Sequence, residues 1–130
     1  MRILALVLLL AACSAEQAEP PAERLLYAGD GRDRLCISGQ RGGFVIYGNG
    51  NANCSARGRI ERSGDRVVLI PDGDADCRIE ARVEGDRLAL SAQSEACAYY
   101  CGPGADYAGK ALTQQASASP AVDFAGDPLC

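Results

Sequence analysis

Apolar and polar side chains alternate through most of the middle of the chain. Around Leu35 and Ile37, and again around Leu88 and Leu90, every second side chain is a large apolar one. A period of two with one charged face is typical of β-strands that are buried on one side. The pattern predicts strands within 34–38, 44–47, 56–61, 77–83 and 87–91.

The run 67–70 is apolar throughout, which predicts a strand that is covered on both faces. Beyond the first twelve residues, no window of eleven shows the apolar stripe of a helix. Turn-forming residues separate the predicted strands, at Gly42-Gly43, 48–53, 63–65, 71–74 and Gly85-Asp86.

A faint repeat indicates how the strands connect. Residues 60–69 resemble residues 82–90, because each stretch reads as a strand, a Gly-Asp turn and a return strand. Two hairpins in succession form a meander. We therefore predict an all-β fold, an antiparallel sheet of six to eight strands that forms a small barrel or a sandwich.

The two ends of the chain differ from this middle. Arg2 precedes an apolar run, 3–12, which is far shorter than the ~20 residues that span a bilayer and has the layout of a secretory signal. Residues 14–23 contain no aromatic or large aliphatic side chain, which predicts a flexible tether. The stretch 113–129 is rich in Ala, Ser and Pro and predicts an irregular tail.

The signal ends at Leu10-Ala11-Ala12-Cys13, which resembles the lipobox of bacterial lipoproteins. The resemblance implies cleavage before Cys13, a diacylglyceryl thioether on its sulfur and acylation of the new amino group. Ser14 resembles the outer-membrane sorting pattern of Gram-negative bacteria, which implies the inner leaflet facing the periplasm. The alternatives are an ordinary secretory signal with an unrelated Cys, or a buried helix.

These features divide the chain into four predicted segments. They are a signal peptide over 1–12, a lipidated Cys13 with its tether over 13–23, a β domain over 24–112 and an irregular tail over 113–130. Loss of Arg2 with the signal changes the formal charge from −4 to −5. Such an acidic chain is a poor match for nucleic acid or an anionic lipid surface.

Seven cysteines minus Cys13 leave an even number in a small exported domain, which predicts three disulfides that staple the fold. Six cysteines allow 15 pairings, and their spacing does not select one. We expect Cys130 to pin the tail, and Cys54, Cys77 and Cys97 to lie at one end of the sheet. The six predicted disulfide cysteines are Cys36, Cys54, Cys77, Cys97, Cys101 and Cys130.

Metal, redox and hydrolytic chemistry lack their usual residues. The chain has no His, which is the commonest general base, and no Cys-x-x-Cys pair. Asp72, Asp74 and Asp76 resemble the start of a calcium loop, but Cys77 and Val83 stand where that loop needs Gly and Glu. We predict a charged turn there, and no metal, cofactor or catalytic residue.

Paired carboxylates are the remaining catalytic possibility, since two of them hydrolyse glycosidic bonds in many enzymes. Glu61, Glu80 and Glu84 fall on the predicted solvent face of the strands, beside arginines. The pattern therefore favours a solvated charged face over an active site.

Residues 97–107 form the candidate binding loop. They hold Tyr99, Tyr100 and Tyr107, two cysteines and a Gly-Pro-Gly turn. Tyrosines on a rigid scaffold often make contact surfaces, because they offer large area at low entropy cost. The alternative is a stapled loop that covers an open barrel end, with the tyrosine rings as its core.

Residues 35–107 resemble small Cys-rich lipoproteins of unassigned function from alphaproteobacteria, through the blocks Asn53-Cys54, 77–81 and 97–102. More distantly, the size, lipobox and meander are similar to the membrane-bound inhibitor of c-type lysozyme. In that family a loop with a Ser and a Lys enters the cleft of the enzyme. Gly102 stands about where the Ser would be, so no inhibitory residue is carried over.

The resemblances imply a membrane-anchored envelope lipoprotein that is a non-enzymatic binding or structural module. Its expected partners are the membrane, through the lipid anchor, and a protein or cell-wall component, but no nucleic acid. A lysozyme-inhibitor-like lipoprotein and a small envelope hydrolase are the alternative functions.

Overall fold

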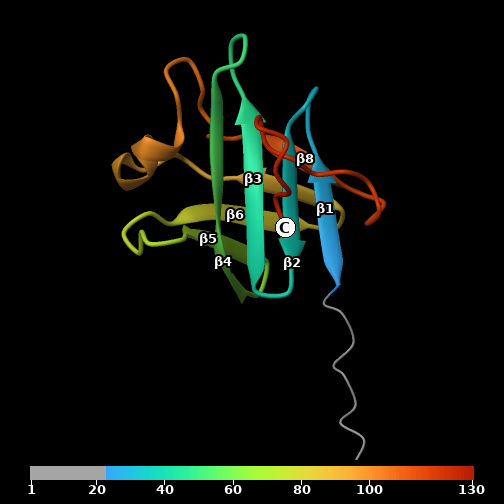
Figure 1. Cartoon of the computed structure of the whole chain (residues 1–130). Helices are drawn as coiled ribbons and strands as arrows, with labels where there is room; N and C mark the ends of the chain where they lie inside the picture. The colour runs from blue at the N-terminus through green and yellow to red at the C-terminus, as the bar shows by residue number, and fades with distance from the viewer. Residues whose placement is uncertain (1–22) are drawn as a thin grey trace, which may run out of the picture.

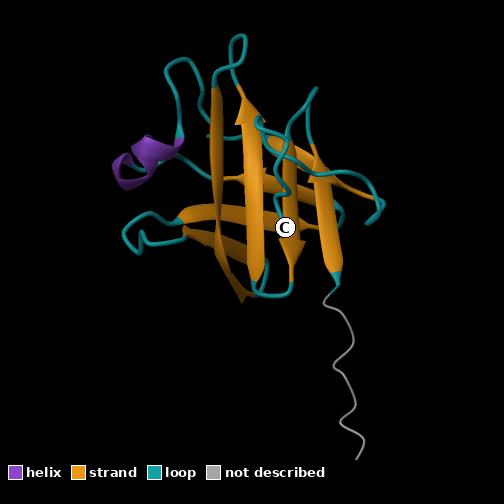
Figure 2. Ribbon diagram, in the orientation of Figure 1, coloured by secondary structure: helices purple, strands orange, loops and turns teal. Residues whose placement is uncertain are grey.

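The computed structural model describes residues 23–130, and these form a closed antiparallel barrel of eight strands (Figures 1 and 2). Each strand pairs with the next along the chain, and β8 pairs with β1. The elements are β1 (Arg24–Ala28), β2 (Arg34–Ser38), β3 (Arg41–Tyr47), β4 (Asn53–Ser63), β5 (Arg66–Pro71), β6 (Ile79–Glu84), β7 (Arg87–Leu90), the 3-10 helix η1 (Glu95–Tyr100) and β8 (Ala111–Gln115).

The all-β prediction is confirmed, and the barrel is favoured over the sandwich. The Gly-Asp hairpins are present, since Gly64-Asp65 joins β4 to β5 and Gly85-Asp86 joins β6 to β7. Within residues 23–130, no helix has the length and apolar character to cross a membrane. The predicted signal peptide, Cys13 and nearly all of the tether lie outside the described residues.

Large side chains from alternate strand positions fill the barrel. Phe44, Ile46 and Leu88 are fully buried in this interior. Tyr107 comes from the long β7–β8 connection, and its ring meets Phe44 edge to face at 5.6 Å between centroids. An eight-stranded barrel is just wide enough for side chains to fill it, so these residues make the interior a packed core.

The run 67–70 is buried on both faces of β5, as predicted. Val67 and Leu69 belong to the interior core. Val68 points outward and is only 3% exposed, because it lies among Arg62, Arg66 and other long side chains. The aliphatic stems of arginine can cover apolar surface while their charged ends stay in water.

The tail covers the outer face of β1, β2 and β3. Ala121 and Leu129 pack there on Leu26, Cys36 and Val45, in a second apolar cluster outside the barrel. The disulfide Cys36–Cys130 closes this layer and pins the tail, as predicted. The tail begins at residue 116, since β8 extends to Gln115 rather than ending near the predicted boundary at 112.

The other two disulfides gather at one end of the barrel, which we call the loop end (connections 29–33, 48–52, 72–78 and 91–110). They join Cys54 to Cys101 and Cys77 to Cys97. The first bridge joins the residue that follows η1 to β4, and the second joins η1 itself to the connection before β6. The prediction that Cys54, Cys77 and Cys97 lie at one end of the sheet is confirmed.

Gly42-Gly43 is not the predicted turn, because both glycines lie within β3 and the turn is at Gly39-Gln40. A Cβ on Gly42 would lie 2.8 Å from the Cys36 carbonyl oxygen. A Cβ on Gly43 would lie 2.6 Å from that of Leu129 in the tail. Glycine inside a strand often marks such a close backbone approach, and here it permits the tail to pack on β3.

Gly58 gives a direct test of the packing between β4 and β5. A Cβ there would lie 1.9 Å from the Ile70 carbonyl oxygen, so Gly58→Ala must displace backbone. We expect the free energy of unfolding to fall by about 1–3 kcal/mol, measured by urea denaturation with the disulfides intact. Gly102→Ala is the control, because its nearest neighbour would be 3.7 Å away. Equal midpoints for the two variants would contradict this close approach of β5 to Gly58.

Candidate functional site

The structure separates the three tyrosines of the candidate binding loop. Tyr99 lies on η1 with its side chain 89% exposed, and Tyr100 beside it is partly buried. Their rings meet edge to face, with centroids 5.2 Å apart. Tyr107 is only 1% exposed and belongs to the barrel core, so its inclusion in a contact surface was wrong. Tyr107 thus plugs the barrel end, as the alternative interpretation of the loop expected, while Tyr99 faces outward and its contact surface stays a prediction.

Disulfides hold the element that presents Tyr99. The helix η1 is a single short 3-10 segment that projects from the side of the barrel (Figure 2). So short a helix has little stability of its own. Cys97 and Cys101 connect it to Cys77, before β6, and to Cys54 in β4. Tyr99 therefore stands on a stapled platform rather than on a free loop.

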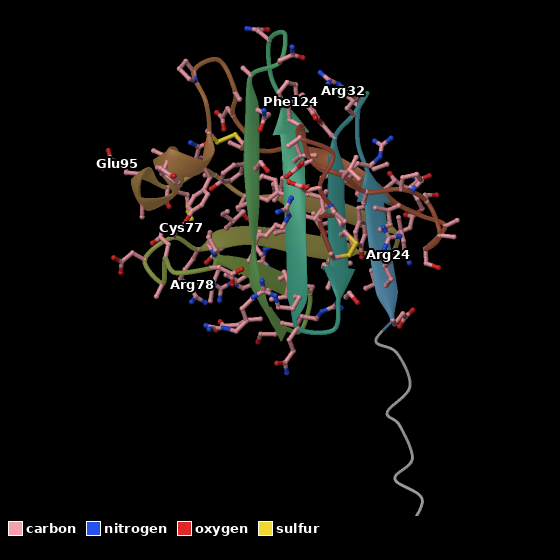
Figure 3. The ribbon with its side chains drawn as sticks, in the orientation of Figure 1. Arg24, Arg32, Cys77, Arg78, Glu95 and Phe124 are labelled. Atoms are coloured by element: carbon pink, nitrogen blue, oxygen red, sulfur yellow. A yellow bond between two sulfur atoms is a disulfide. The ribbon has the colours of Figure 1, made fainter. Side chains whose placement is uncertain are left out.

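The surface around η1 is acidic. Glu95 and Asp106 line one hollow of about 330 Å³ beside the helix, together with Gln93 and Ser94. Within the described part of the chain, neither carboxylate is in an ion pair with an Arg or Lys, and the same holds for Asp76. Figure 3 shows Glu95 at the outer side of the helix. The surface beside η1 thus combines an exposed aromatic ring with carboxylates that have no ion-pair partner among residues 23–130.

Two of the three alternate aspartates, Asp72 and Asp74, accept hydrogen bonds from different partners. Asp72 accepts both guanidinium N–H groups of Arg41. The Asp74 carboxylate accepts the Tyr100 hydroxyl at 3.0 Å and the Cys77 backbone N–H at 3.3 Å. Among residues 23–130, no group of three or more His, Cys, Asp or Glu side chains is arranged to hold a metal ion. The described contacts are those of a charged turn that braces η1.

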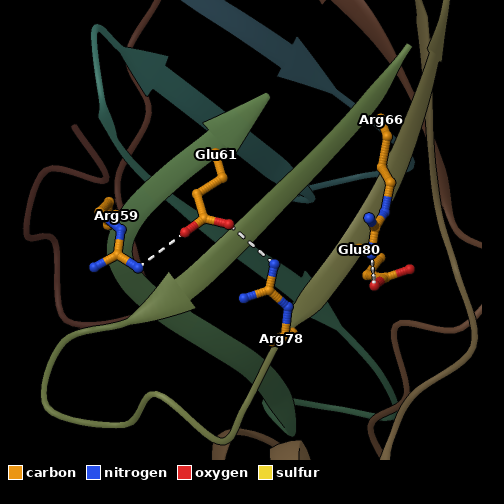
Figure 4. A network of polar contacts seen from close by, with 5 residues as sticks. All are labelled: Arg59, Glu61, Arg66, Arg78 and Glu80. Atoms are coloured by element: carbon orange, nitrogen blue, oxygen red, sulfur yellow. Dashed lines mark hydrogen bonds and ion pairs between the residues drawn. The ribbon is translucent and has the colours of Figure 1, made fainter. Parts of the chain in front are cut away.

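Arginines form ion pairs with Glu61 of β4 and Glu80 of β6 on the outer face of the barrel (Figure 4). Glu61 accepts hydrogen bonds from Arg78 and Arg59, each at 3.0 Å. These bonds lower the pKa of the Glu61 carboxyl below its ordinary value, Arg78 having the larger effect. Glu80 is paired with Arg66, and Glu84 is exposed. The prediction of a solvated charged face is confirmed, and a lowered pKa is the opposite of what a general acid needs.

A larger hollow, which we call the tail groove, was not predicted. It measures about 700 Å³ and lies between the outer face of the barrel and the tail segment 119–126. Its lining residues are Leu26, Ala28, Arg32, Arg34, Tyr47, Gln115, Ser119, Pro120, Val122, Asp123, Phe124, Ala125 and Gly126. In the sequence, the signs of this groove are the large apolar residues Val122 and Phe124 in a tail that otherwise has little pattern. The groove could not be predicted from them, because the sequence does not indicate where the tail packs.

No family model matches the chain, and no curated protein or solved structure matches it. The chemistry of the loop end and of the tail groove therefore rests on their own residues.

The contact between Tyr100 and Asp74 makes a testable prediction about ionisation. Burial raises the pKa of Tyr100 above its ordinary value of 10.0, and the hydrogen bond and charge of Asp74 raise it further. Asp74→Asn should lower this pKa, because the amide carries no negative charge. The change is measured by near-ultraviolet absorbance titration, with Tyr100→Phe to assign the signal.

The raised pKa of Tyr100 also determines how the stability of the fold changes with pH. Tyr100 stabilises the fold fully below its ordinary pKa, and this contribution is lost as the pH rises through the higher folded-state value. Asp76→Asn is the control, since no hydrogen bond joins Asp76 to Tyr100 in the described structure. An identical titration of Tyr100 in wild type and Asp74→Asn would contradict the contact.

Proposed function

We propose that the protein is a lipid-anchored lipoprotein of the bacterial envelope, and that its barrel is a non-enzymatic binding module. The observation that carries this proposal is the pairing of cysteines. All six cysteines of residues 23–130 bond to one another. The seventh, Cys13, therefore has no partner among them and stands at the end of the lipobox-like sequence.

Three disulfides in a small domain support export to an oxidising compartment. Disulfides persist in the periplasm and are rare in the cytosol, where thiols are kept reduced. The stapling also suits the small size of this domain, since each bridge contributes about 2–4 kcal/mol by restricting the unfolded chain. A chain with a lipobox is also exported before it is anchored in the membrane, so the disulfides and the lipobox-like sequence point to the same compartment.

Several acyl chains on Cys13 would make a stable anchor. Each buried CH₂ contributes about 0.8 kcal/mol, and a single chain gives only reversible binding, whereas two or more hold a protein at the bilayer. The described chain enters the barrel at the start of β1, which lies at the end opposite the loop end (Figure 1). The anchor would thus be attached away from η1, which leaves Tyr99 accessible to a partner.

The chemistry of the surface beside η1 supports a cationic partner. Tyr99 offers a large aromatic surface, while Glu95 and Asp106 offer carboxylates without ion-pair partners among residues 23–130. Aromatic rings and carboxylates together attract Lys and Arg side chains, through cation–π contacts and ion pairs. A basic protein surface is the partner that fits this surface.

Lipidation is tested with Cys13→Ser in a Gram-negative host fed a labelled palmitate analogue. The wild type should carry the label and sediment with membranes, because acylation needs the thiol. Cys13→Ser should lose the label and the membrane association. Ser14→Ala, which keeps the lipobox, is the matched control. Unlabelled wild-type protein in the soluble fraction would refute the anchor.

The lysozyme-inhibitor-like alternative is favoured by the acidic surface beside η1 with its exposed Tyr99. If it holds, adding the full chain should lower the activity of a c-type lysozyme, and Tyr99→Ala should weaken the effect about tenfold or more. Arg87→Gln, an exposed change on β7, should leave the effect intact. Lysozyme activity that is unaffected by the wild type would exclude this alternative.

A further inference from the structure

We propose that the tail groove binds an extended acidic peptide segment of a partner protein, with a carboxylate held by Arg32 and Arg34 and an apolar side chain held against Phe124. This inference is independent of the lipid anchor and uses a surface distinct from η1. Figure 3 shows Arg32 and Phe124 at the same side of the barrel, and both line the groove.

The groove has two walls from distant parts of the chain. Leu26 and Ala28 of β1, with Tyr47 of β3, form the barrel wall. The tail forms the opposite wall through Pro120, Val122 and Phe124 among others. The walls leave about 700 Å³ between them, in the range of sites that bind ligands.

The tail wall is held in place at several points. Arg24 donates hydrogen bonds to the carbonyl oxygens of Ser117 and Ser119, the second at 2.9 Å. Arg57 forms an ion pair with Asp123. Together with the Cys36–Cys130 disulfide, these contacts anchor the tail at both ends and in the middle. A groove formed in advance loses little conformational entropy when a ligand binds.

A tight turn presents Phe124 outward. The Asp123 carboxylate accepts the backbone N–H groups of Ala125 and Asp127, each at 2.9 Å, and the Asp123 N–H donates to the Asp127 carbonyl at 2.9 Å. Phe124 at the tip is 55% exposed, and Val122 is 44% exposed. Both side chains line the tail groove, where they offer apolar surface to a ligand.

Two arginines at the groove have no carboxylate partner within residues 23–130. The Arg32 guanidinium lies 3.9 Å from the centre of the Tyr47 ring and donates to the Asn51 side chain. Arg34 donates to the backbone carbonyls of Gly31 and Asp33. Asp123, the one acidic residue of the lining, is already paired with Arg57. The lining therefore has two arginines without a carboxylate partner among residues 23–130, while the buried Asp33 carboxylate behind it accepts the Tyr47 backbone N–H at 2.8 Å.

Charge and shape together select an acidic peptide. Arginine forks bind carboxylates in a bidentate manner, and arginine and aromatic side chains dominate the energetics of many protein interfaces. The arginines of the barrel wall and the apolar side chains of the tail wall line the same groove, so one peptide segment can contact both. A lipid surface is disfavoured, since an extended anionic surface meets the net negative charge of the whole protein, whereas a peptide meets only the groove with its two arginines.

The test uses the full chain with Cys13→Ser, so that lipidation does not affect the result. A phage-displayed random-peptide library is selected on this protein, and we expect enriched peptides with Asp or Glu beside a large apolar residue. The synthetic peptide is then titrated by fluorescence anisotropy. Arg32→Gln with Arg34→Gln, and separately Phe124→Ala, should each raise the Kd about tenfold or more.

Matched variants separate the groove from the rest of the surface. Arg87→Gln removes an exposed arginine from β7, and Tyr99→Ala removes the exposed ring of η1. Both should bind the peptide as the wild type does, and thermal unfolding verifies that every variant is folded.

Three outcomes would overturn the proposal. They are the absence of enriched peptides, an enriched set without acidic residues, and groove variants that bind with unchanged Kd. Phosphatidylglycerol vesicles form a parallel arm. Vesicle binding that depends on Arg32, without an acidic peptide, would assign the groove to lipid headgroups instead. The palmitate experiment is separate, so failure of the anchor and failure of the groove are distinguishable.

Discussion

The pairing of β8 with β1 is the constraint on which the rest of this structure depends. It places Gln115 opposite Leu26 and Thr113 opposite Ala28, and so closes the sheet without a free edge. Closure also decides where the chain goes next. Because β8 ends beside β1, the tail emerges on the outer face of β1 and reaches Cys36 with its last residue. The tail groove is a direct consequence of this closure.

The three disulfides of the closed barrel stabilise two different regions. Cys36–Cys130 holds a layer outside the barrel, whereas the other two bridges hold η1 at the loop end. Tyr107 enters the core from the same connection that contains η1, and it packs on Phe44. One connection therefore supplies both a plug for the barrel and a platform for Tyr99. Changes at Tyr99 should consequently leave the core undisturbed.

Local patterns predicted the strands but not their closure. Period two and the Gly-Asp turns predicted the hairpins β4–β5 and β6–β7, since both signals lie within a few residues of each other. The strands β1 and β8 were missed because neither alternates: Leu25-Leu26-Tyr27 is apolar throughout, and Leu112 is the one large apolar residue of β8. Their pairing also joins residues that are far apart in sequence. Tyr107 was misplaced for the same reason, because burial of a loop residue depends on what the loop covers. Likewise, Gly42-Gly43 resembles a turn until the approach of Leu129 to β3 is known.

Two runs did carry information about the outer face of the barrel. Both 44–46 and 67–70 are apolar at successive positions, so each strand has apolar side chains that the barrel interior cannot accept. The structure covers these in different ways, with arginine side chains over Val68 and with the tail over Val45. Arginine stems are available locally and need no further chain. Covering Val45 with chain brings Leu129 onto the barrel, and the turn at Phe124 is the part of that chain left facing solvent. An uninterrupted apolar strand thus predicts that its outer face is covered, by arginine side chains over Val68 and by a segment of chain over Val45.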